Sequence, residues 1–226
     1  MLSEEILDFY FSLSKPLDLP KGVEVIFPFE NEETKRVMRA FFEKYYHDTN
    51  PRNILFGINP GRNGAGMTGV GFTDPVLMEE ICDIPNSLEK TKELSASFIC
   101  EVVQAYGGPQ KFYGDFLFST VLPFGLLKNG RNYNYYDDAK TLEYFKPFIY
   151  KSVQKQMAFS GIKPTIATIG QGKNLDFLKK LNGELHLFEK IEVLPHPRWV
   201  MQYRRKEKER YIELYIEILS QMKSKL

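Results

Sequence analysis

Apolar and polar residues alternate along this chain in a way that predicts strands and helices in turn. Short apolar runs bounded by Pro, Gly or Asn are typical of buried strands, and five occur, at 23–26, 54–58, 116–121, 165–169 and 191–194. Apolar residues at helical spacing predict helices near 95–106, 137–159, 175–181 and 203–222, with Pro147 kinking or dividing the second of them.

Two amphipathic helices are predicted in the first fifty residues, and both are expected to pack on a sheet. Ser3 is placed to cap the first helix, and Asn31 to cap a second that runs to about His47. The second helix has apolar residues on one face, at Val37, Phe41, Phe42 and Tyr45.

This order of elements favours an α/β fold in which helices flank a parallel sheet. We expect a three-layer α/β/α sandwich whose central, mostly parallel four-stranded sheet is formed by the last four apolar runs. At 226 residues the chain fits one domain, 1–226, with residues 1–50 as a helical N-terminal extension packed on it. Ligands of such sheets bind at the carboxyl ends of the strands, so functional residues are sought in the loops that follow them.

Composition narrows the classes of protein to be considered. Hydrophobic residues make up 43% of the chain and aromatic residues 14%, which excludes a disordered chain. No apolar run has the length of a membrane span, and the N-terminus lacks a secretory pattern, so we expect a monomeric cytoplasmic protein with no membrane partner. The two cysteines, Cys82 and Cys100, suggest neither a disulfide framework nor a metal or iron–sulfur site, and both are expected to be buried. No cofactor is expected.

Charge is distributed unevenly although the formal net charge is only +1. Residues 1–50 hold ten acids and six bases, whereas residues 198–210 hold six bases and two acids. The exposed face of a helix is the ordinary explanation of such a basic run. Alternatively, this segment lies along the phosphates of a nucleic acid, whose contacts position a protein without reading sequence.

The segment 57–75 reads GINPGRNGAGMTGVGFTDP and contains six glycines. Gly64, Gly66 and Gly69 literally satisfy the GxGxxG pattern of a dinucleotide-binding turn, which would imply an NAD(P)-dependent oxidoreductase. In that fold the third glycine begins a helix, whereas here Gly71, Thr73 and Pro75 oppose one. A flexible surface loop is the other ordinary interpretation. However, Asn59 directly follows a buried strand, where its amide would be held rigidly, and Phe72 offers a flat stacking surface.

The same segment resembles the first motif of the single-strand-selective monofunctional uracil-DNA glycosylases, a pattern close to GMNPGPFGMAQTGVPFGE. The Asn, the following ProGly, the ThrGlyVal and the Phe all keep register. The resemblance implies that Asn59 holds the hydrolytic water and that Phe72 stacks on the flipped base. Gly61 and Met67 are expected to contact the substrate beside them.

Near the C-terminus, LPHPRWVMQYRRK resembles the second motif of that family, HPSPRN. The resemblance implies a catalytic role for His196, which precedes Pro197. Trp199, Val200 and Met201 replace the family's DNA wedge, with core packing as their alternative role. Arg198, Trp199, Arg204, Arg205 and Lys206 are the expected DNA-binding residues.

Between these motifs, GlyArgAsn at 130–132 is shared with the family, but its base-reading Asn corresponds to Thr120 here. A hydroxyl rotates and discriminates less than a planar amide, so Thr120 is expected to bind substrate with altered base specificity. The resemblance implies a monofunctional DNA glycosylase that acts on uracil or a related deaminated or oxidised base in DNA, for base excision repair. A noncatalytic DNA-damage binding module is the remaining alternative.

Overall fold

A four-stranded parallel sheet forms the centre of the computed structural model, which describes residues 1–224. The strand order is β3-β2-β6-β7, with bounds Phe116–Thr120, Asn53–Gly57, Thr165–Ile169 and Lys190–Leu194. Each pair of neighbouring strands is parallel. All residues of β2 and β3 are buried, as expected for strands covered on both faces. The predicted sheet of four strands is confirmed.

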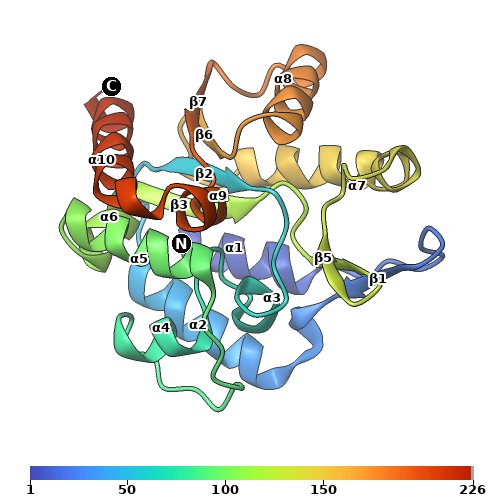
Figure 1. Cartoon of the computed structure of the whole chain (residues 1–226), viewed down its shortest axis with the longest axis horizontal. Helices are drawn as coiled ribbons and strands as arrows, with labels where there is room; N and C mark the ends of the chain where they lie inside the picture. Colours follow the sequence, from blue (N-terminus) through green and yellow to red (C-terminus); the bar gives the residue numbers. More distant parts are fainter. Residues whose placement is uncertain (225–226) are drawn as a thin grey trace.

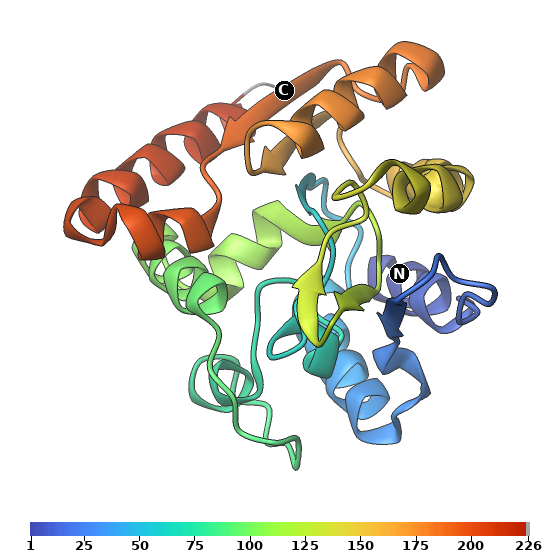
Figure 2. The same ribbon diagram turned by 45° about the vertical axis from the view of Figure 1, so that its right-hand side comes forward.

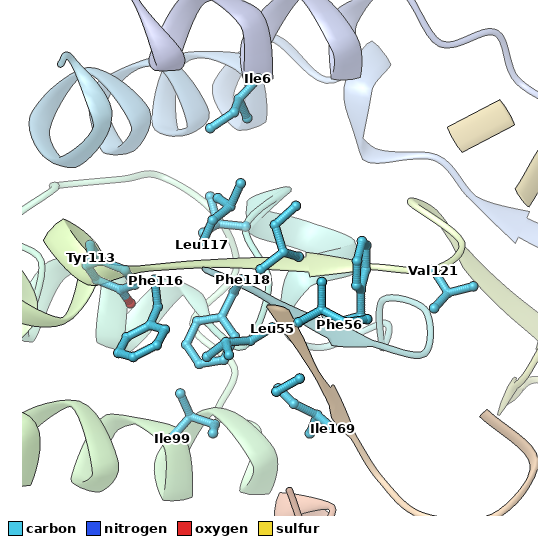
Figure 3. Close-up of a cluster of buried hydrophobic side chains, with 14 of the residues drawn as sticks. Ile6, Leu55, Phe56, Ile99, Tyr113, Phe116, Leu117, Phe118, Val121 and Ile169 are labelled. Atoms are coloured by element: carbon cyan, nitrogen blue, oxygen red, sulfur yellow. The ribbon is translucent and has the colours of Figure 1, made fainter. Parts of the chain in front are cut away.

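Helices cover both faces of this sheet (Figure 1). Ile6 on α1 (Leu2–Phe11) and Ile99 on α5 (Leu94–Tyr106) approach opposite faces, with Leu117, Phe118 and Leu55 between them (Figure 3). Around α1 lie α2 (Glu32–Tyr46) and α7 (Ala139–Met157), and α7 is followed along the chain by β6 and then α8 (Lys173–Leu185). Against α5 pack α9 (Pro197–Tyr203) and α10 (Lys208–Ser224). The three-layer α/β/α sandwich is therefore confirmed.

The expected helices differ from the observed ones mainly at their ends. Asn31 caps α2 through a bond from Thr34 N–H, as predicted. Ser3 does not cap α1: Met1 is the N-cap, and the Ser3 hydroxyl lies 3.3 Å from His47 Nδ1. Pro147 lies inside α7 without dividing it.

The predicted C-terminal helix at 203–222 is wrong at its start. The chain there forms α9, then a 3-10 turn, η2 (Arg205–Glu207), and only then α10. Pro at the first position of α9 favours helix initiation immediately after β7, which the charge-rich sequence of this region obscures. Four further short helices were not predicted: η1 (Pro28–Glu30), α3 (Ala65–Thr68), α4 (Pro75–Glu80) and α6 (Pro109–Asp115).

A second, antiparallel sheet of three strands was also not predicted beyond its first strand. Its order is β1-β4-β5, with bounds Val23–Ile26, Gly125–Lys128 and Arg131–Tyr133. Asn129 and Gly130 join β4 to β5 with positive φ angles of 52° and 69°, as a tight hairpin turn requires. This hairpin stands beside α3 and the loop after β2 (Figure 2).

One hydrophobic cluster runs through the described residues, from Leu2 to Met222. Both N-terminal helices are tied to β3: the Tyr10 hydroxyl lies 3.3 Å from Ser119 Oγ, and the Tyr46 hydroxyl donates to Phe116 O at 2.9 Å. Cys82 is buried and Cys100 is partly buried, so the expectation for the second cysteine is only partly met. Among residues 1–224, no helix combines the length and apolar character that crossing a membrane requires.

Candidate active site

A cavity of about 340 Å³ opens at the carboxyl ends of the central strands. The loop after β2, the end of β3, strand β5, the start of α5 and helix α9 each contribute residues to its lining. Five residues singled out from the sequence line it together: Asn59, Gly61, Phe72, Thr120 and His196. Arg198 and Trp199 complete the same wall, so the two sequence motifs converge on one cavity.

Asn59 is fixed in orientation by one end of its amide. Its Nδ2 donates to Tyr133 O on β5 at 3.0 Å. Its Oδ1 is buried and has no hydrogen-bond partner among the described residues. Leaving a buried acceptor unpaired costs about 1–3 kcal/mol, so this oxygen is set to accept a hydrogen bond from a water or substrate group in the cavity.

His196 follows β7 after one residue, Pro195, and caps α9. Its Nδ1 accepts the backbone N–H of Arg198 at 3.2 Å. Burial, with a smaller contribution from the nearby charge of Arg198, lowers the pKa of His196 from 6.5 to about 4. The ring is therefore neutral at pH 7. Because Nδ1 is the acceptor, the single ring proton is on Nε2, which makes that nitrogen a hydrogen-bond donor.

This lowered pKa predicts a stability change with pH. Between about 4 and 6.5 the unfolded chain binds a proton at His196 that the folded chain does not, so lowering the pH through this window favours unfolding. His196→Gln removes that contribution. The melting temperature of the wild type relative to His196→Gln should therefore fall as the pH is lowered from about 7.5 to about 5.

His186→Asn provides the matched control for that measurement, because His186 is exposed and Asn tolerates its φ of 52°. Its melting temperature should follow that of the wild type across the same pH range. A constant difference between the wild type and His196→Gln would contradict the lowered pKa.

Phe72 forms one face of the cavity through an unusual backbone conformation. Its φ is 57°, and its ring packs on Phe118 with the centroids 5.1 Å apart. Gly57 makes room for it: a Cβ there would lie 3.0 Å from Phe72 Cε2 and 3.4 Å from Thr120 Cγ2. The ring is thus fixed between β2 and β3.

Thr120 lies at the end of β3 and lines the cavity. The strand is positioned from behind by Gln156 on α7, whose Nε2 donates to Thr120 O at 3.2 Å and whose Oε1 accepts from the Ser119 hydroxyl. Gln156 is fully buried. This arrangement fixes the backbone of Thr120, whereas its hydroxyl retains the rotational freedom that an amide lacks.

Met67 does not line the cavity, which is a correction to its expected substrate contact. Its sulfur accepts from the Thr91 hydroxyl at 3.3 Å, and its carbonyl accepts from Thr34 at 2.7 Å. Ala65 reaches the cavity instead, because the one-turn helix α3 changes which side chains face inward. That helix ends at Gly69, whereas a dinucleotide-binding turn would begin one there.

The three residues considered as a DNA wedge, Trp199, Val200 and Met201, differ in their exposure to solvent. Val200 is fully buried and Met201 packs against the core, so neither is free to enter DNA. Trp199 is 40% exposed, with the Arg204 guanidinium 5.3 Å from its ring centroid. Arg204, Arg205 and Lys206 lie outside the cavity on the exposed surface around η2.

Five cavity residues with polar side chains were not predicted as site residues from the sequence: Glu93, Ser95, Asn132, Asn134 and Gln202. The asparagines are on and just after β5, which carries no strong strand signal. Asn132 Oδ1 accepts the backbone N–H of Arg62 at 3.2 Å, which joins the hairpin to the first motif. GlyArgAsn at 130–132 was the available signal for this contact. Nothing in the local sequence around Glu93 indicates a site.

Comparisons with known proteins agree with this geometry. A family model described as the uracil DNA glycosylase superfamily matches residues 43–220. Among solved structures, wild-type SMUG2 of Pedobacter heparinus is 37% identical and superimposes with a TM-score of 0.94, covering 98% of this chain and 97% of that chain. No curated protein matches. The chain therefore belongs to the uracil-DNA glycosylase superfamily and is related to SMUG2.

Proposed function

We propose that this protein is a monofunctional DNA glycosylase in base excision repair. Its substrate is uracil, or a related deaminated or oxidised base, flipped out of DNA. The observation that carries the proposal is the pairing, in one cavity, of the unpartnered Asn59 Oδ1 with the donor Nε2–H of a neutral His196. Asn59 Oδ1 is suited to accept a hydrogen bond from a water, and His196 Nε2–H is suited to donate one to an oxygen on which negative charge develops.

Hydrolysis of an N-glycosidic bond develops positive charge on the sugar and negative charge on the departing base. His196 would donate its Nε2–H to a carbonyl oxygen of that base as the charge develops. Because the imidazole of His196 is neutral at pH 7, it keeps its Nε2 proton. The hydrogen bond from Arg198 N–H to Nδ1 fixes the orientation of the ring. Leaving-group stabilisation by a fixed donor is worth about 10²–10³ in rate at comparable sites.

Asn59 would hold the attacking water through Oδ1. An amide is not a strong base, so cleavage relies mainly on stabilising the leaving group. Phe72 would stack on the flipped ring, and flipping costs least for a mismatched or single-stranded base. In the described part of the chain, the residues lining the cavity include no lysine, which supports hydrolysis by water over attack by an enzyme amine.

A gel assay tests the function directly. Single- and double-stranded oligonucleotides carrying uracil, 5-hydroxymethyluracil or hypoxanthine are incubated with the protein and then cleaved with alkali at abasic sites. We expect excision of at least one base, and no strand cleavage without alkali. Retained DNA binding without excision on any substrate would favour a noncatalytic damage-binding module.

The exposed basic residues around η2 are expected to contribute to DNA binding through phosphates. Replacing Arg204 and Arg205 together by alanine should weaken binding and reduce the slope of log K against log salt by up to about two. Binding isotherms at several salt concentrations measure this. Lys179→Ala with Lys180→Ala, which removes two charges from α8, is the matched control. An unchanged slope in the arginine variant would refute the contact.

A further inference from the structure

Glu93 is the one acidic side chain among the described residues that line the cavity. It immediately precedes α5 as its N-cap residue, on the segment that leads from α4. Its backbone is held at both ends: its N–H donates to Asp74 Oδ2 at 2.9 Å, and its carbonyl accepts from Ser97 N–H at 2.9 Å. The carboxyl group is thus placed by fixed backbone.

Two glycines of the first motif make room for this carboxyl group. A Cβ at Gly61 would lie 2.8 Å from Glu93 Oε1, and a Cβ at Gly64 would lie 2.0 Å from Glu93 Oε2. The second contact is far inside van der Waals distance, and alanine at Gly64 would also lie 2.8 Å from Thr73 O. The glycines therefore allow a carboxylate to lie directly against the loop that carries Asn59.

The Glu93 carboxylate has neither a hydrogen bond nor an ion pair with any of residues 1–224, although it is only partly exposed. Burial raises the pKa of Glu93, Arg198 opposes that rise, and Asp74 adds to it. Desolvating a carboxyl group without giving it a partner is costly. The Glu93 oxygens are not fully buried, so a group bound in the cavity can reach them.

We propose that Glu93 is a specificity-determining residue that accepts a hydrogen bond from an N–H or O–H group of the flipped base. This inference rests on the proposed glycosylase function. A base that presents a donor to Glu93 gives the carboxylate its missing partner. A base that presents only an acceptor there leaves two acceptors facing each other, which strongly disfavours binding. Glu93 would thus recognise a hydrogen-bond donor on the base, which the rotating hydroxyl of Thr120 discriminates poorly.

The test compares bases that differ in whether they present a hydrogen-bond donor at one position. Uracil and 3-methyluracil differ at the ring N–H, whereas 5-hydroxymethyluracil and 5-formyluracil offer a donor or an acceptor at the same position. The value of kcat/KM is measured for excision of all four bases from single-stranded oligonucleotides. The proteins compared are the wild type, Glu93→Gln and Glu93→Ala. Glu89→Gln is the matched control, because Glu89 is exposed on the same segment and outside the cavity.

We expect both Glu93 variants to reduce discrimination within at least one of the two pairs by about tenfold or more. Their melting temperatures should stay near that of the wild type, and Glu89→Gln should discriminate as the wild type does. Equal loss on all four bases would overturn the inference, because a carboxylate acting on the water or merely shaping the cavity would affect every base alike. Unchanged discrimination would overturn it as well.

Failure of the underlying function gives a different result. If the wild type excises none of these bases from single or double strands, the proposed glycosylase activity fails and the inference about Glu93 fails with it. If the wild type is active and the Glu93 variants discriminate as it does, only the inference about Glu93 fails.

Discussion

Replacing His196 by alanine is expected to lower single-turnover excision by about 10²–10³-fold, because the developing base anion loses the imidazole donor that is fixed in the cavity. His196 Nε2 is a donor only because Nδ1 is engaged by Arg198 N–H. The loss should be in kcat more than in KM, since this hydrogen bond strengthens as charge develops in the transition state.

The pH profile adds a second check on His196. With its pKa lowered to about 4, the ring stays neutral from about pH 5.5 upward. Wild-type excision should therefore show no transition near pH 6.5. His186→Asn, on the exposed end of α8, should behave as the wild type. Full activity of His196→Ala would contradict the assigned role, and an activity step near pH 6.5 would contradict the neutral ring.

Replacing Asn59 by alanine is expected to reduce excision by about 100-fold, because the attacking water loses the acceptor that orients it. Asn63→Ala is the matched control, since Asn63 is in the same loop but exposed and outside the cavity. Both variants should melt close to the wild type. Wild-type rates for Asn59→Ala would exclude Oδ1 as the water-binding atom.

Asn59→Asp separates two functions of the same amide. The carboxylate can accept a proton from water, which favours hydrolysis. It also faces Tyr133 O, which accepts from Asn59 Nδ2 at 3.0 Å in the wild type, so two acceptors would then oppose each other. We expect Asn59→Asp to be more active than Asn59→Ala, and to lose activity at low pH as the carboxylate is protonated. Equal activity of the two variants across pH would refute a contribution from the oxygen.

Much of the fold could be predicted because its signals are local. The last four apolar runs become β2, β3, β6 and β7 in turn, and Asn31 caps α2 as its spacing indicates. The hairpin of β4 and β5 was missed because its strands are short and its outer residues polar. The division of the C-terminal region into α9, η2 and α10 was missed because six cations within thirteen residues mask the change of element.

The candidate site could be predicted only where sequence constrains backbone. Asn59 and His196 each lie two residues after the end of a strand, and Phe72 follows Gly71. The structure brings these three residues into one cavity. Met67 was wrongly placed because α3 rotates the side chains after Gly64, and one residue of shift changes which of them faces inward. Val200, considered as a wedge, is core because the opposite face of its short helix is the exposed one.

The sequence by itself determined the order of elements, the strand ends and the register of the two motifs, because helical and strand periodicities and glycine geometry act over a few residues. Only the tertiary structure decided that Glu93 and Asn132 line the same cavity as Asn59, since they come from distant elements. It also decided the proton position on His196 and the missing partner of Asn59 Oδ1. These properties depend on burial and on neighbours across space, which periodicity along the chain does not encode.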